Sequence, residues 1–299
     1  MDMFSSRKEL PTYLIMTMEN RLVVFILSHG RADRVETYES LKRAGYSGDL
    51  YIVCDNEDKT VDEYNKRYGK EKIIVFDKLD VAKRFDAGDN FDNRKTIFYA
   101  RNACFDIAEK LGYKYFIELD DDYNIFAYKF NSNYDYIQKW ILSLDDVFSA
   151  MVEYFETAGI TCLAMAQNGD FIGGRDSWIA KGLNIKRKAM NTLFCSTERK
   201  FEFVGRVNED LNTYVLLGSR GKLFIQIPLV VINQQKSQKS KGGMTDVYLD
   251  SGTYLKSFYS VMYAPSSVKI SLMGDKHKRI HHRINWDSAV PKILRENDA

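Results

Sequence analysis

The sequence has little of what marks several common protein classes. Its four cysteines, Cys54, Cys104, Cys162 and Cys195, show no CxxC spacing, which excludes a zinc knuckle and a disulfide framework and fits a reducing compartment. No apolar run approaches the roughly 20 residues that span a bilayer. Residues 10–18 are too short an apolar stretch, with no small-residue cleavage site, to predict a signal peptide. We therefore expect a cytoplasmic location, in the host-cell cytoplasm if the source is viral.

Strong net charge is also absent, because the formal charge of the chain is only +2. Residues 1–174 hold 22 Lys and Arg against 30 Asp and Glu, a net charge of −8, whereas the remainder holds 21 against 11, a net +10. An acidic half is thus joined to a basic half. With 45% apolar and 28% charged residues, the composition is typical of a globular protein with a substantial core.

Apolar runs alternate with helical patterns along the first half, which predicts an α/β fold with a mixed, mainly parallel central sheet flanked by helices. We expect residues 77–94 to form a loop, because they are polar and contain Gly88. The expected strands are 22–27, 49–54, 72–76, 115–119, 161–166 and 223–227. The expected helices are 33–44, 57–68, 95–111, 143–157, 209–217 and 252–263. No linker forces a division, so we predict one catalytic domain over 20–285, made of halves 20–174 and 175–285, with terminal extensions 1–19 and 286–299.

An acidic triplet, Asp120-Asp121-Asp122, directly follows the apolar strand YFIEL. Open α/β folds bind their ligands where strands leave the carboxyl edge of the sheet. The carboxylates of Asp120 and Asp122 are suited to a hard divalent cation, with phosphate oxygens of a ligand in the remaining positions. The alternative is an acidic turn that serves only solubility.

Two further segments precede the triplet in the predicted sheet. The turn Ser28-His29-Gly30-Arg31 and the residue Asp55 follow the first two strands, so they lie at the same edge as the triplet. The chain has no GxGxxG and no GxxxxGK[ST], which disfavours a dinucleotide site and a P-loop.

Helices supply two more candidate segments. Arg101-Asn102 lies inside the helix before the triplet, where Asn is locally unfavourable and Arg has an exposed salt-bridging role as its alternative. Asn208-Glu209-Asp210 opens a later helix, with Asn208 as the expected cap. The acids also suit the helix dipole, but a carboxylate here could act as a general base on an acceptor hydroxyl.

Basic residues cluster in the second half. The tail at 276–283 holds three of the four histidines, His277, His281 and His282, which could serve a metal or a phosphate or be a solvated strand. The clusters suit a polyanion, although a solvated face is the alternative for each of them. The candidate acceptor-binding residues are Lys186, Arg187, Lys188, Lys239, Lys241 and Arg279.

Taken together, these segments resemble the nucleotide-sugar-dependent glycosyltransferases of the GT-A fold. The resemblance rests on the order of SHGR, VCD at 53–55, ARN at 100–102, the DxD at 120–122 and ED at 209–210, and covers roughly residues 20–285. In that family the DxD holds Mn²⁺ or Mg²⁺ on the diphosphate of a UDP-like donor, and in inverting members a late acid activates the acceptor.

The resemblance implies roles for individual residues. The metal would be held by Asp120 and Asp122, with Asp121 able to shift the register, and with His277, His281 or His282 completing the metal or phosphate shell. The donor would contact Asp55 through its base or ribose. Asp210 or Glu209 would be the catalytic base. The remaining donor-side residues would be Ser28, Arg31, Arg101, Asn102, Asp120 and Asp121.

The acceptor is predicted from the charge asymmetry. A basic half without a membrane anchor suits a polyanionic acceptor, and the chain loosely resembles bacteriophage glycosyltransferases that act on hydroxymethylpyrimidines in DNA. We therefore expect a UDP-sugar donor, a Mn²⁺ or Mg²⁺ cofactor and double-stranded DNA as partner. The alternatives are a glycan or lipopolysaccharide acceptor, a metal-dependent nucleotidyltransferase or nuclease, and a non-catalytic nucleic-acid-binding protein.

Overall fold

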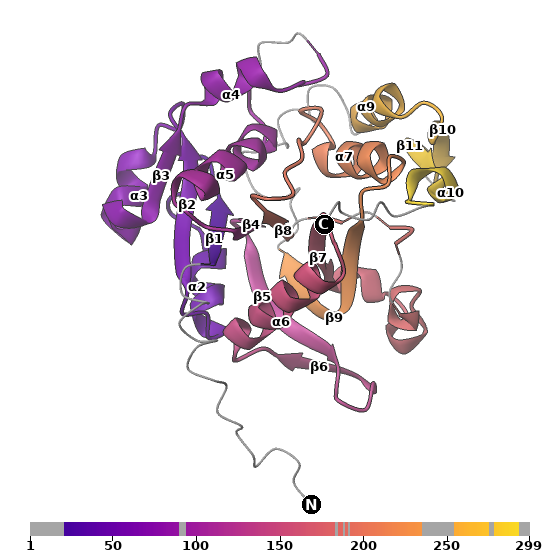
Figure 1. Cartoon of the computed structure of the whole chain (residues 1–299), viewed down its shortest axis with the longest axis horizontal. Coiled ribbons are helices and arrows are strands. Elements are labelled where there is room, and N and C mark those ends of the chain that lie inside the picture. Colours follow the sequence, from indigo (N-terminus) through magenta and orange to yellow (C-terminus); the bar gives the residue numbers. More distant parts are fainter. Residues whose placement is uncertain are drawn as a thin grey trace, which may run out of the picture.

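The computed structural model describes residues 21–89, 94–182, 185–187, 189–190, 192–234, 254–274 and 278–292. The first half follows the predicted alternation of strands and helices (Figure 1). Its elements are β1 (Leu22–Leu27), α2 (Glu36–Arg43), β2 (Asp49–Asp55), α3 (Val61–Tyr68), η1 (Lys70–Lys72), β3 (Ile73–Phe76), α4 (Lys78–Arg84), α5 (Phe98–Lys110) and β4 (Tyr115–Asp120).

The second half continues the same sheet and adds a separate ribbon. Its strands are β5 (Tyr123–Phe130), β6 (Tyr136–Trp140), β7 (Cys162–Gln167), β8 (Leu193–Ser196), β9 (Phe224–Gln234), β10 (Val268–Met273) and β11 (Arg279–Ile284). Its helices are α6 (Leu144–Thr157), η2 (Asn168–Phe171), η3 (Gly174–Asp176), η4 (Ile179–Lys181), α7 (Glu209–Gly218), α9 (Leu255–Tyr263) and α10 (Trp286–Ala289).

Nine strands form one mixed sheet in the order β3-β2-β1-β4-β8-β7-β9-β5-β6. The pairs β3–β2, β2–β1, β1–β4 and β7–β9 are parallel, whereas β8 and β5 are antiparallel to both of their neighbours. Seven of the nine strands therefore run in one direction, which confirms the predicted mixed, mainly parallel sheet.

Helices cover both faces of the sheet. Successive residues of a strand point to opposite faces, so each strand contributes to the apolar clusters on both sides. In β1, Val24 and Ile26 belong to the apolar cluster that includes Leu41 of α2 and Phe148 of α6. Val23, Phe25 and Leu27 belong to the opposite cluster, which includes Cys104 of α5 and Tyr214 of α7. This two-sided burial explains the unbroken apolar run of β1. All four cysteines are free and buried in these layers.

Several helix starts differ from the sequence prediction, and side-chain hydrogen bonds explain those of α3 and α4. α2 begins at Glu36 rather than at Asp33. α3 begins at Val61 because the carboxylates of Asp55 and Asp58 accept the backbone N–H groups of Glu57 and Thr60 in tight turns. The predicted loop 77–94 contains α4, whose N-terminus is capped by the side chain of Asp77.

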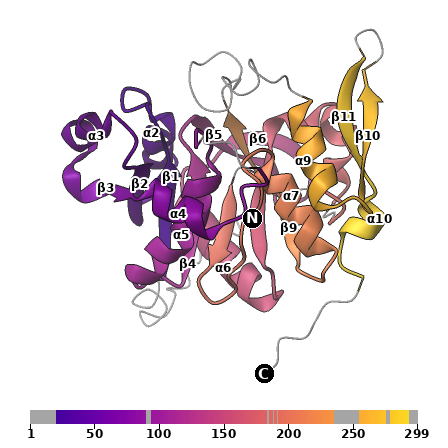
Figure 2. The same cartoon turned by 90° about the horizontal axis from the view of Figure 1, so that it is seen from above.

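The length of β9 and the presence of β10 also depart from the prediction. β9 continues past Pro228 to Gln234. At Pro228 its register against β7 shifts, between the pairs Met165–Ile227 and Ala166–Val231. An irregularity of this kind accommodates a proline within a strand. The basic tail, predicted as a metal or phosphate site or a solvated strand, contributes the strand β11, which pairs with β10 in a two-stranded antiparallel ribbon (Figure 2). None of the described helices is long and apolar enough to cross a bilayer.

Candidate active site

The acidic triplet turns the chain from β4 into β5, and the first turn of α2 holds this turn in place. Thr37 Oγ1 donates to the carbonyl of Asp120 at 2.6 Å and accepts the N–H of Tyr123 at 2.9 Å. The N–H of Thr37 donates to the carbonyl of Asp121 at 3.2 Å. The backbone of the triplet thereby satisfies a first-turn N–H of α2, which explains why this helix needs no side-chain cap.

The three carboxylates of the triplet have different surroundings. Asp121 is buried and accepts from Ser28 Oγ at 2.6 Å and from Arg31 Nη1 at 2.7 Å. Asp122 Oδ2 accepts from Gln234 Nε2 at 3.3 Å, but Asp122 Oδ1 is buried without a hydrogen-bond partner among the described residues. Asp121 is therefore fully engaged within the protein, whereas Asp122 has an oxygen available to a ligand.

Burial raises the pKa of Asp122 to about 7, and the neighbouring charges of Asp120 and Asp121 add to this effect. Burial also raises the pKa of Asp120, although the charge of Arg101 opposes the shift. Burial is the larger cause of both shifts, and the crowding of the three carboxylates adds to it at Asp122. A cation bound there would be electrostatically stabilised.

Arg101 of α5 joins carboxylates from three parts of the chain. It is almost fully buried and contacts Asp120 through Nη2 at 3.1 Å. Its Nη1 lies 3.3 Å from Glu118 Oε2, and its Nε lies 3.0 Å from Glu209 Oε1. One guanidinium therefore fixes β4, the triplet and the start of α7 relative to one another.

Glu118 is the residue of this group that the sequence analysis did not single out. It is completely buried in β4, and its Oε1 has no hydrogen-bond partner among the described residues. Burial raises its pKa to about 8, with the charge of Arg101 acting in the opposite direction. The available signal was a lone acidic residue within the apolar strand YFIEL, since a buried acid requires a partner.

The start of α7 places Glu209 and Asp210 at this cluster. Burial and the charge of Asp210 raise the pKa of Glu209, while Arg101 opposes the shift. The charge of Asp210 also raises the pKa of Asp120, so Asp210 lies in the same electrostatic field. The expectation that Asn208 caps this helix is wrong. Asn208 has a left-handed backbone, with φ of 62°, and its side chain donates to Ser260 Oγ instead of to the helix.

The donor set at the triplet fits a hard divalent cation. Carboxylate oxygens are the ligands that Mg²⁺ and Mn²⁺ prefer, and the buried, unpartnered Asp122 Oδ1 is such a ligand. Among the described residues, no three His, Cys, Asp or Glu side chains form a complete metal site. The geometry therefore suits a cation that shares its coordination with a bound ligand, not a protein-only metal cage.

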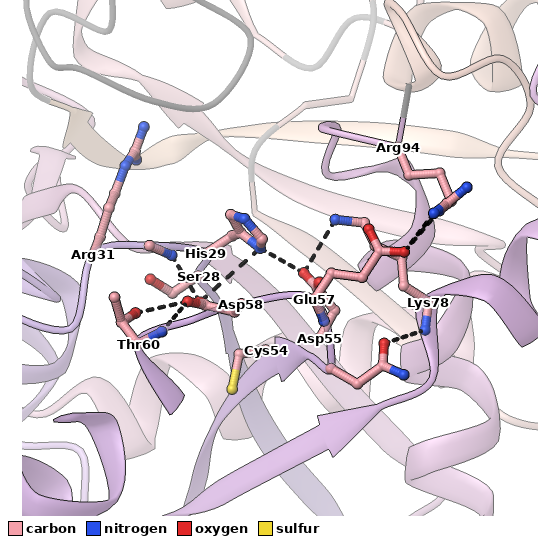
Figure 3. Close-up of polar contacts among 12 residues, drawn as sticks. Ser28, His29, Arg31, Cys54, Asp55, Glu57, Asp58, Thr60, Lys78 and Arg94 are labelled. Atoms are coloured by element: carbon pink, nitrogen blue, oxygen red, sulfur yellow. Dashed lines mark hydrogen bonds and ion pairs between the residues drawn. The ribbon is translucent and has the colours of Figure 1, made fainter. Parts of the chain in front are cut away.

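The turn after β1 forms a second polar group with the end of β2 (Figure 3). Asp55 Oδ2 lies 2.7 Å from His29 Nδ1 and accepts from Lys78 Nζ at 3.2 Å. Burial acts to raise the pKa of Asp55, but the hydrogen bond with His29 and the charge of Lys78 outweigh it and lower this pKa. Asp55 thus remains ionised, and the half-exposed His29 is the member of the pair that a ligand can reach.

The same turn is also held by Tyr64 of α3 and by Asp58, which precedes this helix. Tyr64 Oη lies 2.7 Å from Ser28 Oγ and accepts the N–H of Arg31 at 3.0 Å, while Asp58 accepts the N–H of Gly30 at 2.7 Å. Ser28 is therefore engaged with Tyr64 and Asp121, and Arg31 with Asp121. The roles of Lys78 and Tyr64 could not be predicted from the sequence, because both residues lie in elements that meet this turn only in the tertiary fold.

Asn102 lies behind the cluster and holds a neighbouring segment. Its Oδ1 accepts the N–H of Phe203 at 2.9 Å and its Nδ2 donates to the carbonyl of Phe203 at 3.1 Å. The side chain thereby pairs with both backbone groups of one residue, as a strand would. This contact explains the asparagine in mid-helix, which the family resemblance places around the nucleotide-sugar donor.

Replacing Asn102 with alanine should destabilise the protein. The buried N–H and C=O of Phe203 would each lose a partner, at a cost of about 1–3 kcal/mol per unsatisfied group. Urea denaturation would show this as a lower midpoint with an unchanged slope. Asn131→Ala, in an exposed turn, is the matched control, and an Asn102 variant as stable as this control would contradict the assignment.

Only some of the predicted acceptor residues lie within the described part of the chain. Lys186 forms an ion pair with Asp287 at 2.6 Å, and Arg187 pairs with Asp170. Both line a cavity of about 590 Å³, together with Trp178, Leu211, His282, Ile284 and Trp286. The structure places Arg279 and His281 in β11, and no group of potential metal ligands among the described residues includes His281. Lys188, Lys239, Lys241 and His277 lie outside the described residues.

A family model described as TET-Associated Glycosyltransferase matches residues 22–243. Comparison with curated proteins found no match. Similar solved structures include glucosyl-3-phosphoglycerate synthase from Mycobacterium tuberculosis in complex with Mn²⁺, UDP and phosphoglyceric acid, with 9% identity, a TM-score of 0.46 and coverage of 89% of this chain and 87% of that one. Mannosyl-3-phosphoglycerate synthase from Rubrobacter xylanophilus has 11% identity, a TM-score of 0.43 and coverage of 90% and 88%.

Proposed function

The chain belongs to the TET-associated glycosyltransferase family, and on this premise we propose that it moves a sugar from a UDP-type nucleotide-sugar to a hydroxyl acceptor with a divalent cation. The family match covers β1 to the end of β9, which includes the triplet, Arg101 and the start of α7. Glycosyl transfer follows from the family. The donor, the cation and the acceptor are the content of the proposal.

The observation that supports the donor side is the buried, unpartnered carboxylate oxygen of Asp122 beside Asp120. Asp122 Oδ1 is buried without a partner among the described residues, and burial next to two acids raises the pKa of Asp122 to about 7. These features support a cation between the triplet and an anionic ligand. A nucleoside diphosphate is such a ligand, because its oxygens can complete the coordination of Mn²⁺ or Mg²⁺.

The residues of the cluster then have different roles in the reaction. When bound, the cation would stabilise the negative charge that develops on the leaving diphosphate. Arg101 holds Asp120 in position, and Glu209 is held by the same guanidinium. Asp210, beside Glu209 at the start of α7, is the acid that we assign as general base, taking the proton of the acceptor hydroxyl as the sugar is transferred.

For the acceptor, we propose the hydroxymethyl group of a modified pyrimidine in phage DNA. Support comes from the basic half of the chain, which carries a net charge of +10 after residue 174. A polyanion such as DNA is attracted by this half irrespective of its sequence. Reaching the hydroxymethyl group requires access from the major groove or extrusion of the base.

Binding of UDP in the presence of Mn²⁺ is expected to raise the thermal midpoint of the protein by several degrees. A ligand that binds only the folded state at about 100 times its Kd contributes about 2.7 kcal/mol. A chelator should remove most of the shift. Differential scanning fluorimetry with UDP alone, Mn²⁺ alone and both together measures it. A midpoint that does not move with UDP plus Mn²⁺ would contradict the donor assignment.

The acceptor is tested by transfer from a radiolabelled UDP-sugar to duplex DNA that contains hydroxymethylcytosine. Unmodified duplex, lipopolysaccharide and free glycans are the competing acceptors. Asp210→Asn should keep the thermal shift with UDP and Mn²⁺ while losing transfer, because it removes the base and not the donor site. Transfer to a glycan and never to DNA would reject the DNA acceptor while leaving the donor chemistry intact.

A further inference from the structure

The β10–β11 ribbon forms a sheet of its own, outside the nine-stranded sheet and C-terminal to the residues that the family model matches. Figure 2 shows it at the edge of the molecule, beside α9 and α10. At its foot, Val268 and Ile284 pack with Leu211 and Val215 of α7, the helix that begins with Glu209. The ribbon is therefore joined through packed apolar side chains to the helix that supplies the candidate base.

The register of the ribbon separates two chemically different faces. Directly paired residues in an antiparallel ribbon lie on the same face, and the faces alternate along the strands. One face carries the pairs Val268–Ile284, Ile270–His282 and Leu272–Ile280 and is mostly apolar. The other carries Lys269–Arg283, Ser271–His281 and Met273–Arg279. We call this second set the basic face.

The charges on the basic face destabilise the ribbon. Lys269 and Arg283 are directly opposite each other, and like charges in that position are destabilising. Both are exposed, as is Arg279, and none of the three forms an ion pair with any described residue. A two-stranded ribbon is marginally stable on its own, so repulsion between its strands destabilises it further, and no described contact offsets this. An anionic partner would offset the repulsion.

We propose that the β10–β11 ribbon binds duplex DNA, with its basic face against the phosphates at a groove. The major groove of B-DNA is about 12 Å wide and admits a two-stranded β-ribbon. Lysine and arginine side chains on one face can contact phosphates and release condensed counterions. The inference rests on the proposed function in naming DNA as the partner, and it adds the element that makes the contact.

The apolar face distinguishes this arrangement from an ordinary solvated hairpin. Beyond the packed foot, Ile270, Leu272 and Ile280 remain 41%, 63% and 40% exposed. These side chains lie on the face opposite the basic face, which leaves the basic face to meet the phosphates. A hairpin that was merely solvated would be expected to alternate apolar residues with charges of both signs, as stable surfaces do.

The test compares binding of a fluorescent, unmodified duplex by the full chain and by two variants with the same change of charge. The ribbon variant is Lys269→Gln, Arg279→Gln and Arg283→Gln. The control is Lys59→Gln, Lys66→Gln and Lys70→Gln, three exposed lysines around α3 that form no ion pair with described residues. Fluorescence anisotropy at several salt concentrations gives the dissociation constant and its salt dependence.

The ribbon variant is expected to reduce the slope of log K against log salt by about three units, one for each lost phosphate contact, and the control to leave it unchanged. The thermal midpoint of the ribbon variant should be equal or higher, because the repulsion between residues 269 and 283 is relieved. An unchanged slope, or an equal reduction in the control, would overturn the proposal. So would binding to vesicles of anionic lipid but not to the duplex.

The two proposals fail in different ways. If the full chain transfers sugar to DNA and the ribbon variant binds DNA as tightly as the full chain, the ribbon assignment is wrong and the proposed function stands. If the ribbon variant loses affinity for DNA and no sugar is ever transferred to DNA, the ribbon assignment stands and the acceptor is wrong. If the full chain does not bind duplex DNA at low salt, both are wrong.

Discussion

Replacing Asp122 with asparagine is expected to lower the rate of sugar transfer by about 100-fold or more while leaving the fold at least as stable. A catalytic cation contributes several kcal/mol to the transition state, and each 1.36 kcal/mol corresponds to about a factor of ten. An amide is a weaker ligand than a carboxylate for a hard cation. The substitution also removes a carboxylate that burial and the charges of Asp120 and Asp121 hold at a raised pKa, so it relieves repulsion in the folded state.

The measurement is steady-state transfer at saturating Mn²⁺, accompanied by urea denaturation of the same preparation. Asp121→Asn is the matched control, one residue away. Asp121 is paired with Ser28 and Arg31, so Asp121→Asn should lower the free energy of unfolding by about 1–3 kcal/mol, the cost for a buried charged partner. The dependence of its transfer rate on Mn²⁺ should change little. The reverse result, in which Asp121→Asn abolishes the Mn²⁺ response and Asp122→Asn retains it, would move the metal site by one residue.

Replacing Arg101 with methionine is expected to destabilise the protein by about 3–5 kcal/mol, the cost of removing one partner from a buried ion pair. The variant would leave Glu118 buried without compensation, and Asp120 and Glu209 would lose the same cation. Chemical denaturation followed by circular dichroism gives the free energy of unfolding. Transfer activity should fall as well, because Asp120 and Glu209 lose their common anchor.

Two further variants show whether the loss comes from buried charge. Adding Glu118→Gln to the Arg101 variant should recover at least about 1 kcal/mol, since contacting residues are not additive and the amide carries no charge. Arg84→Met is the surface control. Arg84 pairs with Asp106 at 2.7 Å but is 41% exposed, so about 0–1 kcal/mol is expected. A double variant less stable than Arg101→Met alone would reject the buried-charge explanation.

The elements predicted correctly from the sequence are those whose burial follows directly from the polarity of consecutive residues. β1 is covered on both faces, and its six apolar residues indicate this directly. α4 was missed because its capping residue Asp77 and its short polar sequence look like a loop. The full length of β9 was missed because Pro228 interrupts the pattern, and only the register shift against β7 accommodates it.

The candidate site was predictable where it followed a strand end and not where it depended on tertiary neighbours. The triplet and Asp55 could be placed because the carboxyl ends of parallel strands share an edge. The different surroundings of Asp121 and Asp122 could not be predicted, since they depend on the turn after β1, with Ser28 and Arg31, and on Gln234 at the end of β9. The role of Asn102 was likewise hidden, because its partner Phe203 is 101 residues away.

The four free cysteines provide an internal reporter of this fold. Cys54, Cys104, Cys162 and Cys195 are at most 1% exposed and lie in β2, α5, β7 and β8, which are distributed across the sheet and one of its covering layers. A thiol reagent can reach them only when these layers separate, so the alkylation rate of the native protein measures the opening of the molecule. The same measurement, made on any active-site variant, separates lost chemistry from lost structure without an added probe.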